Sequence, residues 1–331
     1  MGEYMIKGRK AMNGLTVLKI SMFVLLGFCV FMVACTSGKS PEQTVDQRAT
    51  RVDSEQELTV EDYTKIIESN PQDAEAYFDR GLAYARSGNL EQAIRDFTQA
   101  IELDPDYAPA YGNRGIAHDL LGNQEEAIRD FDRVIELDPD DALAYFNRGN
   151  THSNSGHPEQ AIQDYTRAIE LDPGFARAYF HRGNTYLGSG DLKRAIQDYT
   201  KTVELNPSFV DAYFNRGNAY YDSGDLEQAI RDYTKVMELD PAFASVYFNR
   251  GLAYYNSGNL EQAIEDLSKA IELTPEDARS YLIRGNAYYD SGSPGLAVQD
   301  FERYLELAPA DASNLEEVIR MIEQLQPELM P

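Results

Sequence analysis

The chain has 331 residues, of which 43% are hydrophobic and 26% charged, so its composition is that of a folded protein. Lys and Arg total 30 against 55 Asp and Glu, a net charge of −25. The first 35 residues contribute +3, so the remainder carries −28. Such a body repels phosphate, which argues against a nucleic-acid partner. Both cysteines, Cys29 and Cys35, lie in the N-terminal segment, which excludes a disulfide framework or a cysteine-based metal site in the folded body.

Residues 1–34 have the pattern of an export signal. Four basic residues precede residues 20–34, an uncharged run that as a helix of ~22 Å is shorter than the ~30 Å hydrocarbon core of a membrane. The run ends Met32-Val33-Ala34-Cys35, which resembles the lipobox of bacterial lipoproteins, although Met32 stands where that family usually has Leu. The resemblance implies a signal peptide over 1–34, a lipid on Cys35 and an exported chain anchored on the extracytoplasmic side of a membrane. The alternative is an uncleaved signal anchor, which also exports the body.

Residues 35–53 follow this signal and contain almost nothing apolar. Residues 36–53 hold three basic and three acidic side chains among polar ones. A segment of this composition cannot build a core, so we expect a flexible, lipid-anchored tether.

From residue 54 onward the dominant signal is an internal repeat of 34 residues. Proline recurs at this spacing from Pro71 to Pro309. We count places within a unit from Ala74 as place 1, which defines seven units. They are residues 74–107, 108–141, 142–175, 176–209, 210–243, 244–277 and 278–311.

Each unit contains the pattern of two amphipathic helices, which is clearest in residues 210–243. Tyr213, Gly217 and Tyr220 form the apolar stripe of a first helix. Gly224 and Asp225 then predict a turn and the N-cap of a second helix. The second stripe is Ala229, Tyr233 and Val236, and Asp240-Pro241 ends the helix because proline disfavours helix at the residue before it.

This pattern of an early aromatic, a glycine, a tyrosine, a later small residue and a terminal proline resembles the tetratricopeptide repeat. The resemblance implies an all-α fold in which antiparallel helix pairs stack into a right-handed superhelical solenoid with a concave groove. Such a stack needs closed ends. We expect an N-terminal capping helix within residues 54–73, opened by the capping box Ser54-x-x-Glu57. We expect a C-terminal capping helix within residues 312–331, opened by Ser313-x-x-Glu316 with a stripe of Leu315, Val318, Ile319, Ile322 and Leu325.

The inventory of chemical groups argues against an enzyme. No phosphate-binding glycine loop and no H-E-x-x-H string occurs. His118 and His152 stand where other units place a tyrosine, so we interpret them as aromatic residues at the edge of the core rather than as metal ligands. We therefore expect no catalytic residue, no metal and no cofactor.

Every unit has Arg at place 7 and Asp at place 23. The usual family residue at place 7 is an interior leucine, so one extra cation and one extra anion per unit predict a structural ion-pair ladder. Its central members are Arg148, Asp164, Arg182, Asp198, Arg216 and Asp232. Capture of an anion by the arginines is the alternative, and the equal number of aspartates argues against it.

A second stripe of the first helices, at places 2, 5, 6, 9, 12 and 13, lines the groove if the family geometry holds. Amides offer donors and acceptors to a peptide backbone, and aromatic rings offer apolar contact. The predicted groove residues are Phe146, Asn147, Asn150, Arg177, Phe180, His181, Asn184, Phe214, Asn215, Asn218, Tyr221, Phe248, Asn249 and Tyr255.

Together these features predict a non-catalytic scaffold or adaptor of the bacterial cell envelope. Its partner would be another protein or an extended peptide, neutral or basic because the body is acidic. Two alternatives remain open at this point: a self-associating structural solenoid, and an envelope protein that binds a small molecule or glycan.

Overall fold

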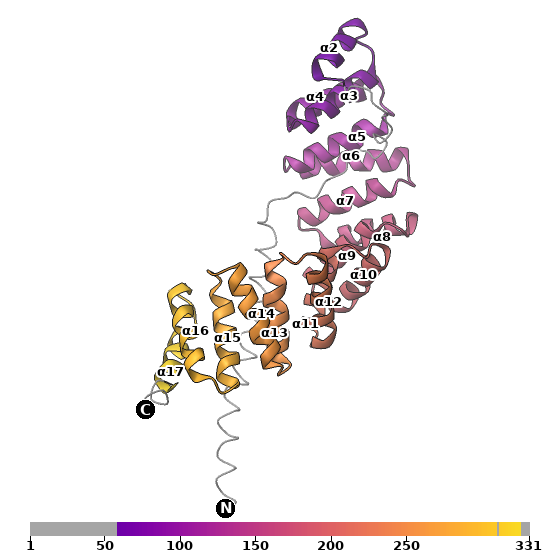
Figure 1. The fold of residues 1–331 in the computed structure, drawn as a ribbon. Helices are drawn as coiled ribbons and strands as arrows, with labels where there is room; N and C mark the ends of the chain where they lie inside the picture. Colours follow the sequence, from indigo (N-terminus) through magenta and orange to yellow (C-terminus); the bar gives the residue numbers. More distant parts are fainter. Residues whose placement is uncertain (1–57, 310, 326–331) are drawn as a thin grey trace, which may run out of the picture. The chain divides into compact units, whose positions relative to one another are not determined.

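The computed structural model describes residues 58–309 and 311–325, which form sixteen α-helices joined by short turns (Figure 1). Residues 1–57 lie outside the described residues, and with them the predicted signal peptide, the lipidation site Cys35 and the tether. The helices are α2 (Val60–Ser69), α3 (Ala74–Arg86), α4 (Leu90–Leu103), α5 (Ala108–Leu120), α6 (Gln124–Leu137), α7 (Ala142–Asn154), α8 (Pro158–Leu171), α9 (Ala176–Gly188), α10 (Leu192–Leu205), α11 (Val210–Asp222), α12 (Leu226–Leu239), α13 (Ala244–Asn256), α14 (Leu260–Leu273), α15 (Ala278–Asp290), α16 (Pro294–Leu307) and α17 (Leu315–Leu325).

These helices form the all-α solenoid that the repeat predicts. The first helix of each unit begins at place 1 and packs against the second helix of its own unit. The second helix in turn packs against the first helix of the next unit. Consecutive first helices also contact one another, from α3·α5 to α13·α15, whereas no such contact joins consecutive second helices of the described residues. The first helices therefore lie on the inside of the stack. We call the surface formed by α3, α5, α7, α9, α11, α13 and α15 the inner face.

The core of a unit comes from the two stripes predicted from the sequence. In α11 and α12, Ala229, Tyr233 and Val236 are buried against the first helix. Gly217 allows this approach, because a Cβ there would lie 2.7 Å from Cε1 of Tyr233. At the turn, Gly224 has a φ of +85°, a conformation that side-chain-bearing residues rarely adopt. Asp225 then accepts a hydrogen bond from the backbone N–H of Gln228, which confirms the predicted N-cap.

The N-terminal capping helix begins later than predicted. Residues 54–57 lie outside the described part of the chain, and α2 begins at Val60. Its capping box is made by Thr59 and Asp62, whose side chains bond each other's backbone N–H groups. The predicted start at Ser54 and Glu57 is therefore wrong, because the same motif recurs five residues further on and that copy forms the cap.

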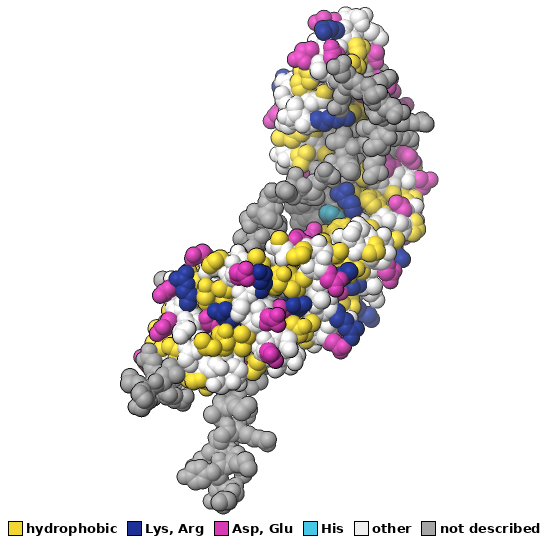
Figure 2. Space-filling model, viewed as in Figure 1, with side chains coloured by type: hydrophobic (Ala, Val, Ile, Leu, Met, Phe, Trp, Pro, Cys, Tyr) yellow, Lys and Arg dark blue, Asp and Glu magenta, His cyan; other side chains and the backbone are white. Residues whose placement is uncertain are grey.

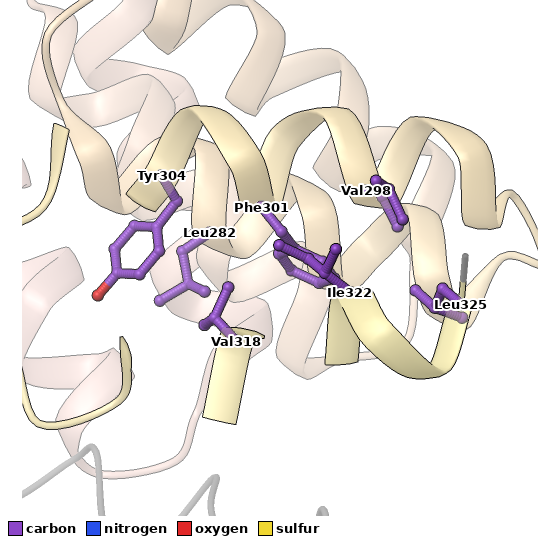
Figure 3. Packing of buried hydrophobic residues seen from close by; sticks show 8 residues of the cluster. Leu282, Val298, Phe301, Tyr304, Val318, Ile322 and Leu325 are labelled. Atoms are coloured by element: carbon purple, nitrogen blue, oxygen red, sulfur yellow. The ribbon is translucent and has the colours of Figure 1, made fainter. Parts of the chain in front are cut away.

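The C-terminal capping helix closes the last unit with an apolar face. Figure 3 shows Val318, Ile322 and Leu325 of α17 packed against Leu282 and residues of α16, and all of these are buried. Two details of the prediction are wrong. The backbone carbonyl of Asn314, not Ser313, accepts the first helical hydrogen bonds, and Ile319 is 44% exposed. Met321, two residues further along the helix, packs against the cluster in its stead.

None of the helices α2–α17 combines the length and the apolar character that crossing a bilayer needs.

Candidate binding face

The inner face carries a row of phenylalanines at place 5, whose rings pack into their own repeat. Phe180 lies 5.9 Å from the ring of Tyr199 and 4.7 Å from that of Phe209, measured between centroids. Phe146, Phe214 and Phe78 make the equivalent pairs in their units. The ring at place 5 therefore stabilises its own repeat, and only its remaining exposed surface is available to a partner.

Two of the predicted groove residues are buried and do not face a partner. Phe146 is 2% exposed because Arg177 lies over its ring and His181 packs against its edge. Tyr255 is 6% exposed, and its hydroxyl donates to Asp290 of the next repeat. Phe180, Phe214, Phe248 and Tyr221 are half-buried. The prediction that all of these aromatic rings contact a partner is therefore wrong for Phe146 and Tyr255.

The asparagines of the inner face bond one another across repeats. Asn215 donates to Oδ1 of Asn184 at 3.0 Å, and Asn249 donates to Oδ1 of Asn218 at 2.9 Å. The same oxygens accept from the hydroxyls of Tyr199 and Tyr233. Oδ1 of Asn150 accepts from Tyr165 in the same way. These three carbonyl oxygens are occupied, so the amides offer a partner N–H groups rather than a full donor and acceptor pair.

The inner face also carries carboxylates that have no protein partner, which the sequence analysis did not single out. Among the described residues, Asp211 and Asp222 on α11 have neither a hydrogen bond nor an ion pair, and burial raises the pKa of both carboxyl groups. On α3, burial and the neighbouring Glu75 raise the pKa of Asp79. Asp211 and Asp222 therefore give the inner face of α11 a negative charge that no ion pair within the described residues compensates, whereas Arg86 offsets part of the charge of Asp79.

Arg177 and His181 form a different environment at the fourth repeat. The Arg177 guanidinium carbon lies 5.5 Å from the centre of the Phe146 ring, a cation–π contact. Burial and the adjacent Arg177 charge lower the pKa of His181 to about 4, so the imidazole is neutral at physiological pH. His181 packs between Phe146 and Phe180 as an aromatic ring.

The arginines at place 7 and the aspartates at place 23 meet between the two helices of each repeat. Arg182 donates from Nε and Nη2 to the two carboxylate oxygens of Asp198, both at 2.8 Å. Arg148 and Arg216 bind Asp164 and Asp232 with the same fork geometry. These aspartate side chains are at most 8% exposed, so the pairs lie out of contact with a partner.

Each arginine also reaches the preceding repeat, a contact that the sequence analysis missed. Nη1 of Arg182 donates to the hydroxyl of Thr166 at 2.9 Å, and Arg216 does the same to Thr200. The Thr200 hydroxyl donates in turn to the carbonyl of Ile196. Arg148 of the third repeat donates instead to Asp132, which stands in the second repeat at the place of the threonine. The recurrence of Thr, Asp or Ser at place 25 was the available signal, and the ladder therefore links repeats as well as helices.

His118 and His152 lie near the ends of the first helices α5 and α7. His152 lies 3.8 Å from Asp164, and burial lowers its pKa. Burial also lowers the pKa of His118. In the described residues, no group of three or more His, Cys, Asp or Glu side chains is arranged to hold a metal ion. Figure 2 shows that basic and acidic side chains are interspersed on the visible face of the C-terminal repeats.

Comparison with known proteins agrees with this architecture. Profiles described as TPR repeat match residues 183–224, 217–258 and 251–292. Profiles described as tetratricopeptide repeat match 60–108, 78–142, 142–175, 164–197 and 278–311. No match was found among the curated proteins.

Several solved structures have a similar fold. The C-terminal part of a TPR repeat-containing protein from Cytophaga hutchinsonii is 19% identical with a TM-score of 0.64, over 74% of this chain and 99% of that chain. A tetratricopeptide repeat protein from Parabacteroides merdae is 19% identical with a TM-score of 0.53, over 76% and 98%. MamA is 29% identical with a TM-score of 0.47, over 48% and 92%. The profiles together span residues 60–311, and the chain belongs to the tetratricopeptide repeat family.

Proposed function

We propose that this chain is a non-catalytic adaptor that holds a neutral or basic protein segment against its inner face. The observation that carries the proposal is that aspartates on one side of the first helices are paired with arginines, whereas aspartates on the other side are not. Between the helices, every ladder aspartate is paired with an arginine. On the inner face, Asp211 and Asp222 have no partner among the described residues.

Unpaired carboxylates that are partly shielded from water are costly to the protein when it is alone. Asp79 is half-buried, whereas Asp211 and Asp222 lie exposed at the surface of α11. Partial removal of water disfavours the charged form, which is why the pKa of Asp79, Asp211 and Asp222 rises. A Lys or Arg side chain from a partner would restore the lost interaction by a charge-assisted hydrogen bond. The amide N–H groups of Asn147 and Asn184 lie on the same face and would hold the partner's backbone carbonyls.

We further propose that the adaptor is anchored in the bacterial envelope through a lipid on Cys35, with the uncleaved signal anchor as the alternative. The support is the lipobox-like Met32-Val33-Ala34-Cys35 and the polar segment that follows it. Such a tether would keep the solenoid near the membrane while leaving the inner face accessible.

Site-specific photo-crosslinking in the native cell tests the inner face. A photoreactive residue replaces Ser245, an exposed inner-face residue, or Gln262, an exposed residue of α14. We expect a crosslinked partner only from Ser245. The variant Asp79→Asn, Asp211→Asn, Asp222→Asn should weaken that crosslink at least tenfold, since the loss of a single such pair is already worth ~1.4 kcal/mol.

The matched control changes the same number of charges on second helices. Glu102→Gln, Glu159→Gln and Glu265→Gln alter exposed carboxylates that form no ion pair in the described structure. We expect this variant to crosslink as the wild type does. If the control loses the crosslink and the inner-face variant keeps it, the partner docks on the second helices and the proposal is wrong.

Metabolic lipid labelling tests the anchor separately. Cys35→Ala should abolish the label and leave a precursor that keeps residues 1–34. A mature wild-type protein that retains residues 1–34 would instead identify the uncleaved signal anchor.

A further inference from the structure

The second repeat breaks the pattern of the inner face at place 5. The other six repeats hold Phe78, Phe146, Phe180, Phe214, Phe248 or Leu282 there, whereas the second repeat holds Gly112. Glycine in the interior of a helix costs about 1 kcal/mol relative to alanine. The backbone of Gly112 has no positive φ, so the turn-forming property of glycine does not explain its presence in α5.

The missing side chain leaves space beside α5. Of the atoms in the described part of the chain, a Cβ built on Gly112 would meet only Cγ2 of Val134 within 4 Å, at 3.8 Å. At Gly115, the other glycine of α5, a Cβ would by contrast lie 2.9 Å from the Phe131 ring. The ring that would fill the gap from the end of the unit is missing as well. Place 34 is an aromatic residue in four repeats but Asp141 here, and Asp141 caps α7 instead.

Apolar side chains frame this space. Arg177 lies over Phe146 and Arg279 lies over Phe248, so place 2 of one repeat covers place 5 of the repeat before it. By this register Leu143, at place 2 of the third repeat, stands next to Gly112. Leu143 is 41% exposed, and Val134 forms the buried wall. The space at Gly112 is therefore bordered by an apolar side chain from its own repeat and by one from the next repeat.

The neighbouring first helix supplies negative charge. Helix α5 contacts α3 on one side and α7 on the other. On α3, Glu75 and Asp79 are one turn apart, and the charge of Glu75 contributes to the raised pKa of Asp79. Arg86 offsets part of this negative charge, and a further cation brought between the two carboxylates would stabilise them.

We propose that the gap at Gly112 is a subsite for one aromatic side chain of a bound extended segment, and that a basic residue of that segment pairs with Asp79. Packed helices are separated by about 8–10 Å, which an extended chain covers in about three residues. The preferred segment therefore carries its basic residue two or three positions from the aromatic one. This inference rests on the proposed function of the inner face.

Selection from a random peptide library tests the subsite. The probe is a displayed library of randomised eight-residue peptides, selected on the full chain kept in mild detergent. Wild type and Gly112→Ala, which leaves the gap open, should both enrich an aromatic residue with Lys or Arg two or three positions away. Gly112→Phe and Gly112→Leu restore side chains that other repeats carry at place 5, so we expect them to fold and to lose the aromatic enrichment.

Synthetic peptides taken from the selection give the magnitude. We expect Gly112→Phe to raise the Kd about tenfold or more, as replacing the peptide's aromatic residue by alanine should do on the wild type. Asp79→Asn should remove the preference for the basic residue and keep the aromatic one.

The outcomes separate the two proposals. Enrichment of basic residues without any aromatic preference would overturn the subsite and leave the proposed function standing. Aromatic enrichment that persists in both Gly112→Phe and Gly112→Leu, with helix content unchanged, would also overturn the subsite. No enrichment on any variant would overturn both.

Discussion

Removal of one ladder arginine should destabilise the solenoid far more than removal of a surface arginine. Arg182 is 15% exposed and Asp198 is 8% exposed. The change Arg182→Ala removes two hydrogen bonds to the Asp198 carboxylate and one to Thr166. It leaves the carboxylate between the helices of the fourth repeat without its cation.

The magnitude follows from the stranded carboxylate. Breaking a buried pair by removing one partner costs about 3–5 kcal/mol. The protein can limit this cost by protonating the carboxyl group. An aspartate of ordinary pKa titrates near 3.9, so keeping it protonated costs at most about 4 kcal/mol at pH 7 and at most about 1.5 kcal/mol at pH 5. We therefore expect a loss of about 3–4 kcal/mol at pH 7 that shrinks as the pH falls.

Urea unfolding followed by circular dichroism at pH 7 and pH 5 measures both values. Arg167→Ala is the matched control, since Arg167 is 43% exposed and pairs with Glu170 on the surface of α8. Its removal should cost less than ~1 kcal/mol. The double variant Arg182→Leu, Asp198→Ala places an apolar side chain between the helices and should recover most of the stability.

Two results would contradict this reasoning. If Arg182→Ala and Arg167→Ala lower the free energy of unfolding equally, the ladder arginine is solvated. If the loss at pH 5 equals the loss at pH 7, the cost comes from lost packing of the arginine stem rather than from the stranded charge.

Two further predictions concern single positions of the inner helices. Burial and Arg177 lower the pKa of His181 to about 4, whereas a histidine in the unfolded chain has a pKa near 6.5. Between pH 4 and pH 6.5 the unfolded state therefore binds more protons than the folded state, and the free energy of unfolding rises with pH. The variant His181→Asn carries the residue found at this place in four other repeats. It should lose less stability than the wild type between pH 7 and pH 4.5, by about 2–3 kcal/mol, and equal losses in urea unfolding would refute a buried neutral imidazole. Gly217→Ala should lower the free energy of unfolding by about 1–3 kcal/mol, since the new Cβ would lie 2.7 Å from Cε1 of the buried Tyr233. An unchanged Tm in a thermal melt would show that the ring can move aside.

The sequence alone determined the period, the helix pairs and the residues between them. These features are local, because a glycine, an aspartate and a proline at fixed places end one helix and begin the next whatever the neighbouring repeats do. The inward stripe of α12 could be predicted for the same reason, since Ala229, Tyr233 and Val236 share one face of a helix and are buried.

The availability of inner-face side chains was decided by the tertiary structure. Phe146 and Phe180 stand at the same place of adjacent repeats, yet Phe146 is 2% exposed and Phe180 is half-buried. The difference comes from the following repeat, which lays Arg177 over Phe146. Asn184 likewise offers its oxygen to Asn215, a residue 31 positions further along the chain.

The physical reason is that each repeat buries its faces only against its neighbours. The place of a residue within the unit determines the side of the helix on which it lies, and the 34-residue period allows that place to be read from the sequence. Whether that side is then covered depends on a side chain one repeat away, through packing and hydrogen bonds that the repeat pattern does not specify. The subsite that we propose at Gly112 depends on a neighbour in the same way, because the exposed Leu143 beside it comes from the following repeat.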